Sequence, residues 1–285
     1  MERFSDPENA ARWCAEQRER GLGIGFVPTM GALHDGHLEL VRRSVRDNDL
    51  TCVSIFVNPL QFDNAADLAG YPRDLEGDFV RLERTGCRMV FTGTLERFFP
   101  GVASPAEIPR EDAGPSASGL EGQYRPGHFS GVATIVRRLF ELVRPERAYF
   151  GEKDFQQTLV VRHLAGRLGY PEIVVCDTVR DPSGLAWSSR NVRLSPHERQ
   201  WAQSISRALF AARDAWAAGE RDGARLQRIM LDELEGSGLD VEYAEVRDPE
   251  HWQADAPAGP MMRAQGLVAA RAGETRLIDS MRLDG

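Results

Sequence analysis

Residues 26–41, FVPTMGALHDGHLELV, connect a short apolar run to an amphipathic one through a loop that contains two glycines and two histidines. The apolar run, IGFVP at 24–28, predicts a β-strand. The run HLELVRRSVRDN at 37–48 has leucines and valines at helical spacing with arginines on the other face, which predicts an amphipathic helix. A strand that continues into a helix through a glycine-containing loop is typical of a parallel α/β sheet.

The alternation of strands and helices extends along most of the chain. Further strands are predicted at residues 51–58, 87–93, 147–151 and 172–179, and further helices at 7–20, 71–86, 131–143 and 154–169. The strands are apolar throughout, as in strands that are buried on both faces of a sheet. The pattern therefore predicts an α/β fold built on a doubly wound parallel sheet of the Rossmann type.

The character of the sequence changes near Thr178. Two helices are expected at 195–219 and 223–236, followed by short strands at 241–248, 266–273 and 275–280. We therefore predict a Rossmann-like domain at 1–178 and a smaller α+β domain at 179–285, which carries the loop 187–191 and closes over the site. The alternating pattern weakens from Leu95 to Gly127, and residues 101–127 are rich in glycine, proline and serine, so we expect one long loop at 101–127.

The composition disfavours a nucleic-acid-binding protein, a membrane protein and a secreted protein. A net charge of −8 gives the chain no general attraction for nucleic acid, although it does not exclude a local basic site for a small anion. No apolar run approaches the roughly 18 residues of a membrane span, and the polar N-terminus does not resemble a signal peptide. The four cysteines have no paired spacing and lie in apolar contexts, so they are expected to be reduced core thiols of a cytoplasmic protein.

His34 and His37 lie at the predicted start of the helix that follows the first apolar run. Backbone N–H groups and the helix dipole at such a position favour phosphate, and neutral imidazoles add donors without a permanent charge. Gly36 between them lets a ligand approach the backbone closely. We therefore prefer a phosphate site to an ordinary pair of polar turn histidines. A metal site is disfavoured, because no third histidine and no cluster of cysteines or aspartates stands nearby.

Three further polar segments carry groups suited to the same chemistry. In NPLQF at 58–62, the amide of Gln61 can bind both a hydroxyl and a carboxylate without adding charge. Lys153 stands where a helix begins and can bridge an α-phosphate and a leaving pyrophosphate. WSSRN at 187–191 combines two hydroxyls with Arg190 in a loop that can close over a triphosphate. Taken alone, each segment is also compatible with an ordinary polar turn.

PTMGALHDGHLELV at 28–41 resembles the nucleotide-binding signature of the pantothenate synthetases, or pantoate–β-alanine ligases. H-x-G-H alone marks the wider superfamily of nucleotidyltransferases and class I aminoacyl-tRNA synthetases, whereas the longer string is much more specific. Further strings similar to those of the family follow in order over almost the whole chain: SIFVNPLQF, YPRDLEGD, LEGQYRPGHFSGVATIV, AYFGEKDFQQ, SSRNVRLS and TRLIDS. Trp187 departs from the family pattern, which has methionine or leucine at this position.

The resemblance implies a large set of ATP contacts and a pair of substrate contacts. The ATP-binding residues would be Met30, Gly31, Ala32, Leu33, His34, Asp35, Gly36, His37, Gly151, Glu152, Lys153, Asp154, Val179, Trp187, Ser188, Ser189 and Arg190. The candidate catalytic residues among them are His37, His34, Lys153 and Arg190. Gln61 and Gln157 would bind pantoate, and Gln61 also β-alanine. No protein ligand is assigned to a metal, since Mg²⁺ is expected to be held mainly by ATP oxygens and water.

A member of this family would join (R)-pantoate to β-alanine with ATP, giving pantothenate, AMP and pyrophosphate through a pantoyl adenylate. It would be a cytoplasmic homodimer with no membrane or nucleic-acid partner. Two alternatives are another nucleotidyltransferase with H-x-G-H, and a non-catalytic ATP-binding regulator. The pair Gln61 and Gln157 disfavours the first, and the intact phosphate-binding set disfavours the second. His128 is either an ordinary loop histidine or a functional one, and the sequence leaves both open.

Two other nucleotide-binding patterns are rejected. GLGIGF at 21–26 mimics a dinucleotide-binding fingerprint, but it precedes its strand instead of following it. A Walker lysine motif does not occur.

Overall fold

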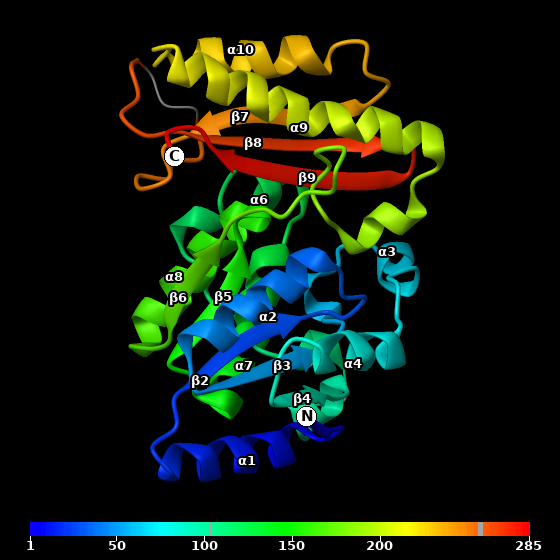
Figure 1. Cartoon of the computed structure of the whole chain (residues 1–285), viewed down its shortest axis with the longest axis vertical. Helices are drawn as coiled ribbons and strands as arrows, with labels where there is room; N and C mark the ends of the chain where they lie inside the picture. The colour runs from blue at the N-terminus through cyan, green and yellow to red at the C-terminus, as the bar shows by residue number, and fades with distance from the viewer. Residues whose placement is uncertain (103, 256–258) are drawn as a thin grey trace. The chain divides into compact units, whose positions relative to one another are not determined.

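The computed structural model of the chain describes residues 1–102, 104–255 and 259–285, which divide into two compact units (Figure 1). Unit 1 comprises Met1–Ala117, Glu121–Gly151 and Gln156–Cys176, and unit 2 comprises Ser118–Leu120, Glu152–Phe155 and Asp177–Gly285. Two short segments that precede residue 178 thus belong to unit 2. The functional division of the chain into domains at residue 178 stays a prediction.

A six-stranded parallel sheet forms the centre of unit 1. Its strands are β1 (Glu2–Phe4), β2 (Ile24–Thr29), β3 (Leu50–Ile55), β4 (Met89–Thr92), β5 (Arg147–Gly151) and β6 (Glu172–Cys176). Their order across the sheet is β1-β4-β3-β2-β5-β6, with every neighbouring pair parallel. The chain leaves β2 toward β3 on one side and returns to β5 on the other. The order therefore reverses at β2, where open α/β sheets bind ligands at the carboxyl ends of the strands.

Helices cover both faces of this sheet, which confirms the predicted fold class. The helices in the described part of unit 1 are α1 (Pro7–Glu19), α2 (Asp35–Asp47), α3 (Ala65–Ala69), α4 (Leu75–Glu83), α5 (Leu95–Phe98), α6 (Leu120–Tyr124), α7 (His128–Val143) and α8 (Phe155–Leu168). Of these, α6 and α8 begin with a residue of unit 2. Neighbouring residues of a strand point to opposite faces. Phe26 and Phe91 pack with α1, α7 and α8, whereas Val27 and Val90 pack with α2 and α4.

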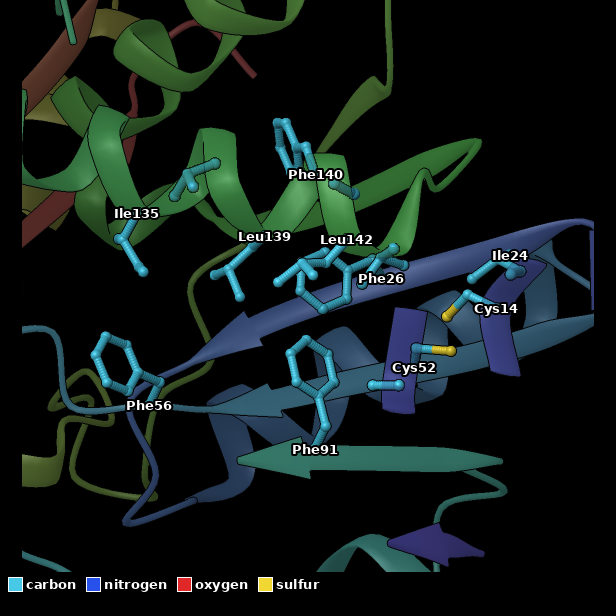
Figure 2. Close-up of a cluster of buried hydrophobic side chains, with 14 of the residues drawn as sticks. Cys14, Ile24, Phe26, Cys52, Phe56, Phe91, Ile135, Leu139, Phe140 and Leu142 are labelled. Atoms are coloured by element: carbon cyan, nitrogen blue, oxygen red, sulfur yellow. The ribbon is translucent and has the colours of Figure 1, made fainter. Parts of the chain in front are cut away.

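The larger core of unit 1 lies between the sheet and α7. Figure 2 shows Phe26 and Phe91 pointing from their strands toward Leu139 and Leu142 of that helix. The rings of Phe26 and Phe91 are stacked, with centroids 6.1 Å apart. Burial of these aromatic and aliphatic side chains, each contributing roughly 1.5–3 kcal/mol, fixes the helix against the strands. The sheet therefore provides a rigid base for the loops at its carboxyl edge.

The prediction of one long loop at 101–127 was wrong in detail. The structure has the 3₁₀ turns η2 (Pro105–Glu107) and η3 (Pro115–Ala117) and the helix α6 (Leu120–Tyr124) in this range, of which residue 103 lies outside the described residues. Each of these elements has three to five residues. Such lengths are too short for a 3.6-residue hydrophobic period to be visible in the sequence. The three-residue strand β1 was also missed, because three residues are too few to show the two-residue alternation of a strand.

Unit 2 contains the predicted α+β arrangement. The helices α9 (Pro196–Ala217) and α10 (Gly223–Leu234) pack on the antiparallel sheet β7-β8-β9, formed by Asp240–Arg247, Gln265–Ala272 and Thr275–Arg282 (Figure 1). Ser195 caps α9, where its hydroxyl accepts from the Glu198 N–H and the Glu198 carboxylate accepts from the Ser195 N–H. Two 3₁₀ turns, η4 (Glu152–Asp154) and η5 (Ser189–Arg193), complete the unit.

The four cysteines are free thiols, and three of them are buried as expected. All four cysteines lie within the described residues, and none forms a disulfide bond. Cys14, Cys52 and Cys87 are buried, and burial raises the pKa of the Cys87 thiol to about 12, so these thiols are core side chains. No helix in the described part of the chain is long and apolar enough to cross a membrane.

Candidate functional site

The loop between β2 and α2 is fixed by a buried carboxylate from α4. Gly31 has φ +80° and Ala32 has φ +49°, so the chain turns through the left-handed region at both residues. A Cβ atom at Gly31 would lie 2.9 Å from the Ile55 side chain, so only glycine fits there. The Asp78 carboxylate accepts from the Ala32 N–H over 2.9 Å and from the Leu33 N–H over 2.7 Å.

Asp78 is almost fully buried, with 2 % of its surface exposed. Burial raises its pKa above the ordinary value, and the two backbone hydrogen bonds lower it in part. An internal carboxylate with these partners stabilises one backbone conformation of the loop. That conformation sets the position of the two histidines that follow.

His34 and His37 stand together at the start of α2. His34 is the N-cap residue, and its backbone N–H donates to Nδ1 of His37 over a long 3.4 Å. The two rings have centroids 4.0 Å apart and an interplanar angle of 31°. Since Nδ1 of His37 accepts, the proton of this neutral imidazole lies on Nε2. Both side chains are half-buried. A neutral imidazole can donate to a ligand without a permanent positive charge.

The remaining predicted residues of this loop are close by in the chain. Met30 and Ala32 are half-buried, whereas Leu33 points into the core beneath α2. Asp35 and Gly36 form the first turn of the helix, with Asp35 exposed. The start of α2 therefore combines the backbone N–H groups of a first helical turn with imidazole donors, an arrangement suited to phosphate oxygens.

The two predicted substrate-binding glutamines lie on different elements of unit 1. Gln61 ends the turn η1 (Pro59–Gln61), which follows β3. Gln157 lies in the first turn of α8, which follows β5 after the segment of Lys153. The neighbouring Gln156 has another role, because its buried amide donates to the Ser116 carbonyl and accepts from the Glu121 N–H. Gln157 is half-buried, so of the two neighbouring glutamines only Gln156 is a buried structural residue.

Lys153 belongs to unit 2, where β9 fixes the turn η4 that carries it. The Ser280 hydroxyl donates to the Glu152 carbonyl over 2.7 Å, and Nε2 of Gln265 donates to the Glu152 carboxylate over 3.2 Å. Burial raises the pKa of Glu152, and the hydrogen bond from Gln265 lowers it in part. The ammonium of Lys153 lies 3.4 Å from the Asp154 carboxylate and remains 18 % exposed. Gly151, just before this turn, is the last residue of β5.

An internal ion pair ties the start of the 177–195 segment to the same strand. Arg180 donates to both carboxylate oxygens of Asp279, over 2.5 and 3.1 Å. Burial raises the pKa of Asp279, while the Arg180 guanidinium and the charge of Lys153 lower it. Because Asp279 adjoins Ser280 on β9, one strand supports both the lysine turn and this segment.

The residues predicted to bind adenine and triphosphate follow along the same segment. The Trp187 N–H donates to the Val179 carbonyl over 3.0 Å, which brings the two residues together. The Ser188 hydroxyl accepts from the Arg190 N–H over 3.2 Å and caps the turn η5, which contains Ser189 and Arg190. All four residues from Trp187 to Arg190 are half-buried.

The predicted residues thus form two groups, one in each unit. Unit 1 contains the loop 30–37, Gln61, Gly151 and Gln157. Unit 2 contains Glu152, Lys153, Asp154, Val179 and the segment 187–190. Within the described residues, no group of three or more His, Cys, Asp or Glu side chains is placed to hold a metal ion.

The structure adds residues that the sequence did not single out as members of a site. Asp78 supports the histidine loop, and Gln265, Asp279 and Ser280 support the lysine turn and the following segment. Asp78 lies in the string YPRDLEGD, and Asp279 and Ser280 lie in TRLIDS. The similarity of these strings to those of the family was the only indication in the sequence that the three residues belong to a site. Their partners lie far away in the sequence, so the contacts themselves could not be read from it.

Comparison with known proteins gives one consistent family. The sequence profile of the family described as pantoate-beta-alanine ligase matches residues 2–282. A pantothenate synthetase of Gluconobacter oxydans is 47% identical over 262 residues, 91% of this chain and 93% of the relative. One of Rubrobacter xylanophilus is 47% identical over 282 residues, 97% of this chain and 95% of the relative.

Solved structures agree. A pantothenate synthetase from Thermus thermophilus has a TM-score of 0.86 and 42% identity, and the match covers 99% of both chains. A pantoate-beta-alanine ligase from Francisella tularensis, solved with beta-gamma ATP and beta-alanine, has a TM-score of 0.79 and 29% identity. That match covers 100% of this chain and 98% of the Francisella chain.

Proposed function

Because the chain belongs to the pantoate–β-alanine ligase family, we propose that it joins pantoate to β-alanine while it cleaves ATP to AMP and pyrophosphate. It is an enzyme of the ligase class, with ATP as a substrate. The observation that carries the site assignment is the pair His34 and His37, held at the start of α2 beside the reversal of strand order.

In the first half-reaction, an oxygen of the pantoate carboxylate attacks the α-phosphorus of ATP. A new P–O bond forms, the bond to the β-phosphate oxygen breaks, and pyrophosphate leaves with the electron pair. Negative charge builds on the α-phosphate and on pyrophosphate. Imidazole N–H groups of His34 and His37, the ammonium of Lys153, and the hydroxyls and guanidinium of 188–190 are the groups suited to stabilise it.

In the second half-reaction, the neutral amine of β-alanine attacks the acyl carbon of pantoyl adenylate. The new C–N bond replaces the C–O bond to AMP, and the amine loses a proton. Activation is needed because a free carboxylate is a poor acyl donor, whereas its mixed anhydride with AMP has a good leaving group. In this proposal, Gln61 and Gln157 hold pantoate by neutral hydrogen bonds, which suit a hydroxy acid.

The other ATP contacts follow from the same assignment. The backbone N–H groups of 30–37 bind phosphate, Gly151 to Asp154 bind ATP, and the Val179 backbone and Trp187 lie at adenine. The smaller domain at 179–285 closes over the bound nucleotide.

We propose that Mg²⁺ is bound as a complex with ATP. The described part of the chain has no cluster of three or more His, Cys, Asp or Glu groups placed to hold a metal, so phosphate oxygens and water would supply most ligands. The ion would neutralise part of the triphosphate charge. We also propose that the enzyme is a homodimer that works in the cytoplasm, and analytical ultracentrifugation tests the dimer.

The experiment that tests the function is an AMP-release assay. AMP should form from ATP when pantoate and β-alanine are both present, and omission of either acid should abolish steady turnover. Release of AMP with another acid or amine, but not with this pair, would favour a different nucleotidyltransferase. Tight ATP binding without any AMP release would favour the non-catalytic regulator.

A further inference from the structure

The side chain of Gln61 is held from within its own turn. The Asn58 Oδ1 atom accepts from the Leu60 N–H over 3.1 Å, while its Nδ2 donates to the Gly131 carbonyl over 3.2 Å. These two backbone partners fix which end of the Asn58 amide is oxygen and which is nitrogen. In the flipped orientation, the Asn58 amino group would meet the Leu60 N–H and the Asn58 oxygen would meet the Gly131 carbonyl oxygen, and neither pair can form a hydrogen bond. Nδ2 of Asn58 then also donates to Oε1 of Gln61 over 2.9 Å.

This contact determines which end of the Gln61 amide a ligand meets. Oε1 faces Asn58, so the Nε2 amino group is left to bind a ligand. Asn58 is 1 % exposed, which keeps this hydrogen bond away from competing water. Gln61 is therefore oriented as a hydrogen-bond donor, although a free glutamine can donate or accept equally well.

The backbone of Gln61 is held from a second direction by the segment that begins α7. Nδ1 of His128 donates to the Gln61 carbonyl over 2.8 Å, and the Arg125 guanidinium donates to the same oxygen over 3.2 Å. Arg125 also approaches Nε2 of His128 at 3.3 Å. Since a guanidinium can only donate, Nε2 must accept, and His128 is the neutral tautomer with its proton on Nδ1.

Close packing removes the remaining freedom of this turn. A Cβ atom at Gly131 would lie 2.0 Å from the Leu60 carbonyl oxygen, so the α7 backbone lies directly against η1. His128 is 7 % exposed, and the Arg125 side chain is 13 % exposed and lies near two carboxylates. The groups that hold Gln61 are thus buried or nearly so and are paired with one another, unlike those of a surface turn.

We propose that Asn58, Arg125 and His128 are positioning residues that present Gln61 as a donor to an acceptor oxygen of the hydroxy-acid substrate. The inference rests on the proposed function, which assigns Gln61 to pantoate, and it gives His128 the role that the sequence left open. Donation suits the carboxylate of the acid, whose oxygens can only accept. The three positioning residues act through Gln61 and touch no reacting atom.

The test for His128 compares two substitutions. His128→Leu removes the Nδ1–H donor, whereas His128→Asn places an amide N–H near the same point. We expect His128→Leu to raise the pantoate KM about tenfold, as the loss of one hydrogen bond of ordinary strength does, with the ATP KM within about twofold. His128→Asn should recover most of that loss. His251→Leu, at an exposed histidine of unit 2, is the matched control and should behave as the wild type.

Coupling to Gln61 separates positioning from a general structural effect. In a Gln61→Ala background, His128→Leu should raise the pantoate KM little further, because the group that it positions is gone. Fully additive losses, an equal rise in the ATP KM, or a rise in the β-alanine KM alone would overturn the proposal. A wild type that releases no AMP with pantoate and β-alanine would instead overturn the proposed function, and this inference with it.

A second pair of variants keeps the proposal testable if His128→Leu does not fold. Gln61→Glu replaces the donor by acceptors only, and Gln61→Met keeps the shape without either. If Gln61 donates, Glu should weaken pantoate binding at least as much as Met, because its carboxylate repels the substrate carboxylate. Pantoate binding by Gln61→Glu that clearly exceeds that of Gln61→Met would show that the residue accepts, and would overturn the inferred orientation.

Discussion

The backbone N–H of Leu33 donates to the Asp78 carboxylate over 2.7 Å, although 45 residues separate the two in the sequence. The N–H of Ala32 donates to the other carboxylate oxygen over 2.9 Å. Ala32 has φ +49°, a conformation that residues other than glycine rarely adopt. Asp78 therefore stabilises a strained turn that leads directly into His34, and its protonation couples to the stability of that turn.

The stability contributed by Asp78 should depend on pH in a definite direction. Burial raises the pKa of Asp78 above its ordinary value of about 3.9, and the two backbone hydrogen bonds offset this only in part. The folded chain thus binds this proton more tightly than the unfolded chain does. The stability gained from the proton is fully present below the ordinary pKa and is lost as the pH rises through the folded-state pKa.

Asp78→Asn removes this titration. The free energy of unfolding of the variant, relative to the wild type, should rise as the pH increases from about 3.5 and should level off above the folded-state pKa. Urea unfolding at a series of pH values measures the difference. Curves that run parallel over this range would show that Asp78 titrates alike in the folded and unfolded chains.

His37→Ala should lower kcat much more than it weakens ATP or pantoate binding. In the proposed reaction, the Nε2–H of His37 meets charge that develops on the phosphates. Removal of one such donor costs about 2.7–4 kcal/mol, or roughly 10²–10³ in rate. Steady-state kinetics with His251→Ala as a control checks this. An unchanged kcat with a raised ATP KM would assign His37 to ground-state binding instead.

Gln157→Ala should weaken pantoate binding and leave ATP binding nearly intact. A neutral amide suits a hydroxy acid but contributes little to a triphosphate, whereas the ammonium of Lys153 does the opposite. Calorimetric titration with ATP alone compares Gln157→Ala with Lys153→Ala. Gln156→Ala, which removes the buried structural amide, should lower the melting temperature instead. Equal losses of ATP affinity in Gln157→Ala and Lys153→Ala would refute the assignment.

Ser280→Ala should reduce turnover through the turn that carries Lys153. The Ser280 hydroxyl donates to the Glu152 carbonyl over 2.7 Å, and Ser280 is 1 % exposed, so its loss leaves that carbonyl with one partner fewer in a largely buried contact. We expect a loss of stability of about 1–3 kcal/mol and a drop in kcat of roughly tenfold. Ser237→Ala, in the same unit, is the control. Wild-type kcat in a folded Ser280→Ala would show that the lysine turn is held without this contact.

The parts of the fold that could be predicted are those with a local signal. The strand and the helix around residues 24–47 are visible because the six strand residues form a nearly continuous apolar run and the thirteen helix residues carry apolar side chains at helical spacing. The strand Glu2–Phe4 has three residues and owes its existence to pairing with β4, about 87 positions along the chain. Its own sequence carries no period long enough to indicate a strand.

The candidate site divides in the same way. His34 and His37 are three residues apart, so the start of one helix brings them together and the sequence suffices to pair them. Ser280 contacts Glu152 across 128 residues, and His128 contacts Gln61 across 67. Such pairs depend on how strands and helices pack, and a single sequence gives no periodicity or spacing that would indicate them. The supporting residues are therefore what the structure adds.

The proposed reaction should be separable into two halves. An acyl adenylate forms from pantoate and ATP before any amine is needed, so the enzyme with pantoate and Mg²⁺ should exchange labelled pyrophosphate into ATP without β-alanine. Addition of β-alanine should then draw the adenylate forward and give AMP, never ADP. The absence of a Walker lysine motif from the sequence agrees with attack at the α-phosphorus instead of γ-phosphoryl transfer.

Substitution of Arg190 tests which half-reaction depends on the loop 187–191. Its N–H donates to the Ser188 hydroxyl in the turn η5, and the proposal gives its guanidinium to the triphosphate, which is present only in the first half-reaction. Arg190→Ala should therefore depress pyrophosphate exchange about as much as it depresses overall turnover, whereas loss of a residue needed only for amine attack would leave exchange intact. If exchange in the wild type requires β-alanine, or if ADP is formed, the acyl-adenylate mechanism is wrong.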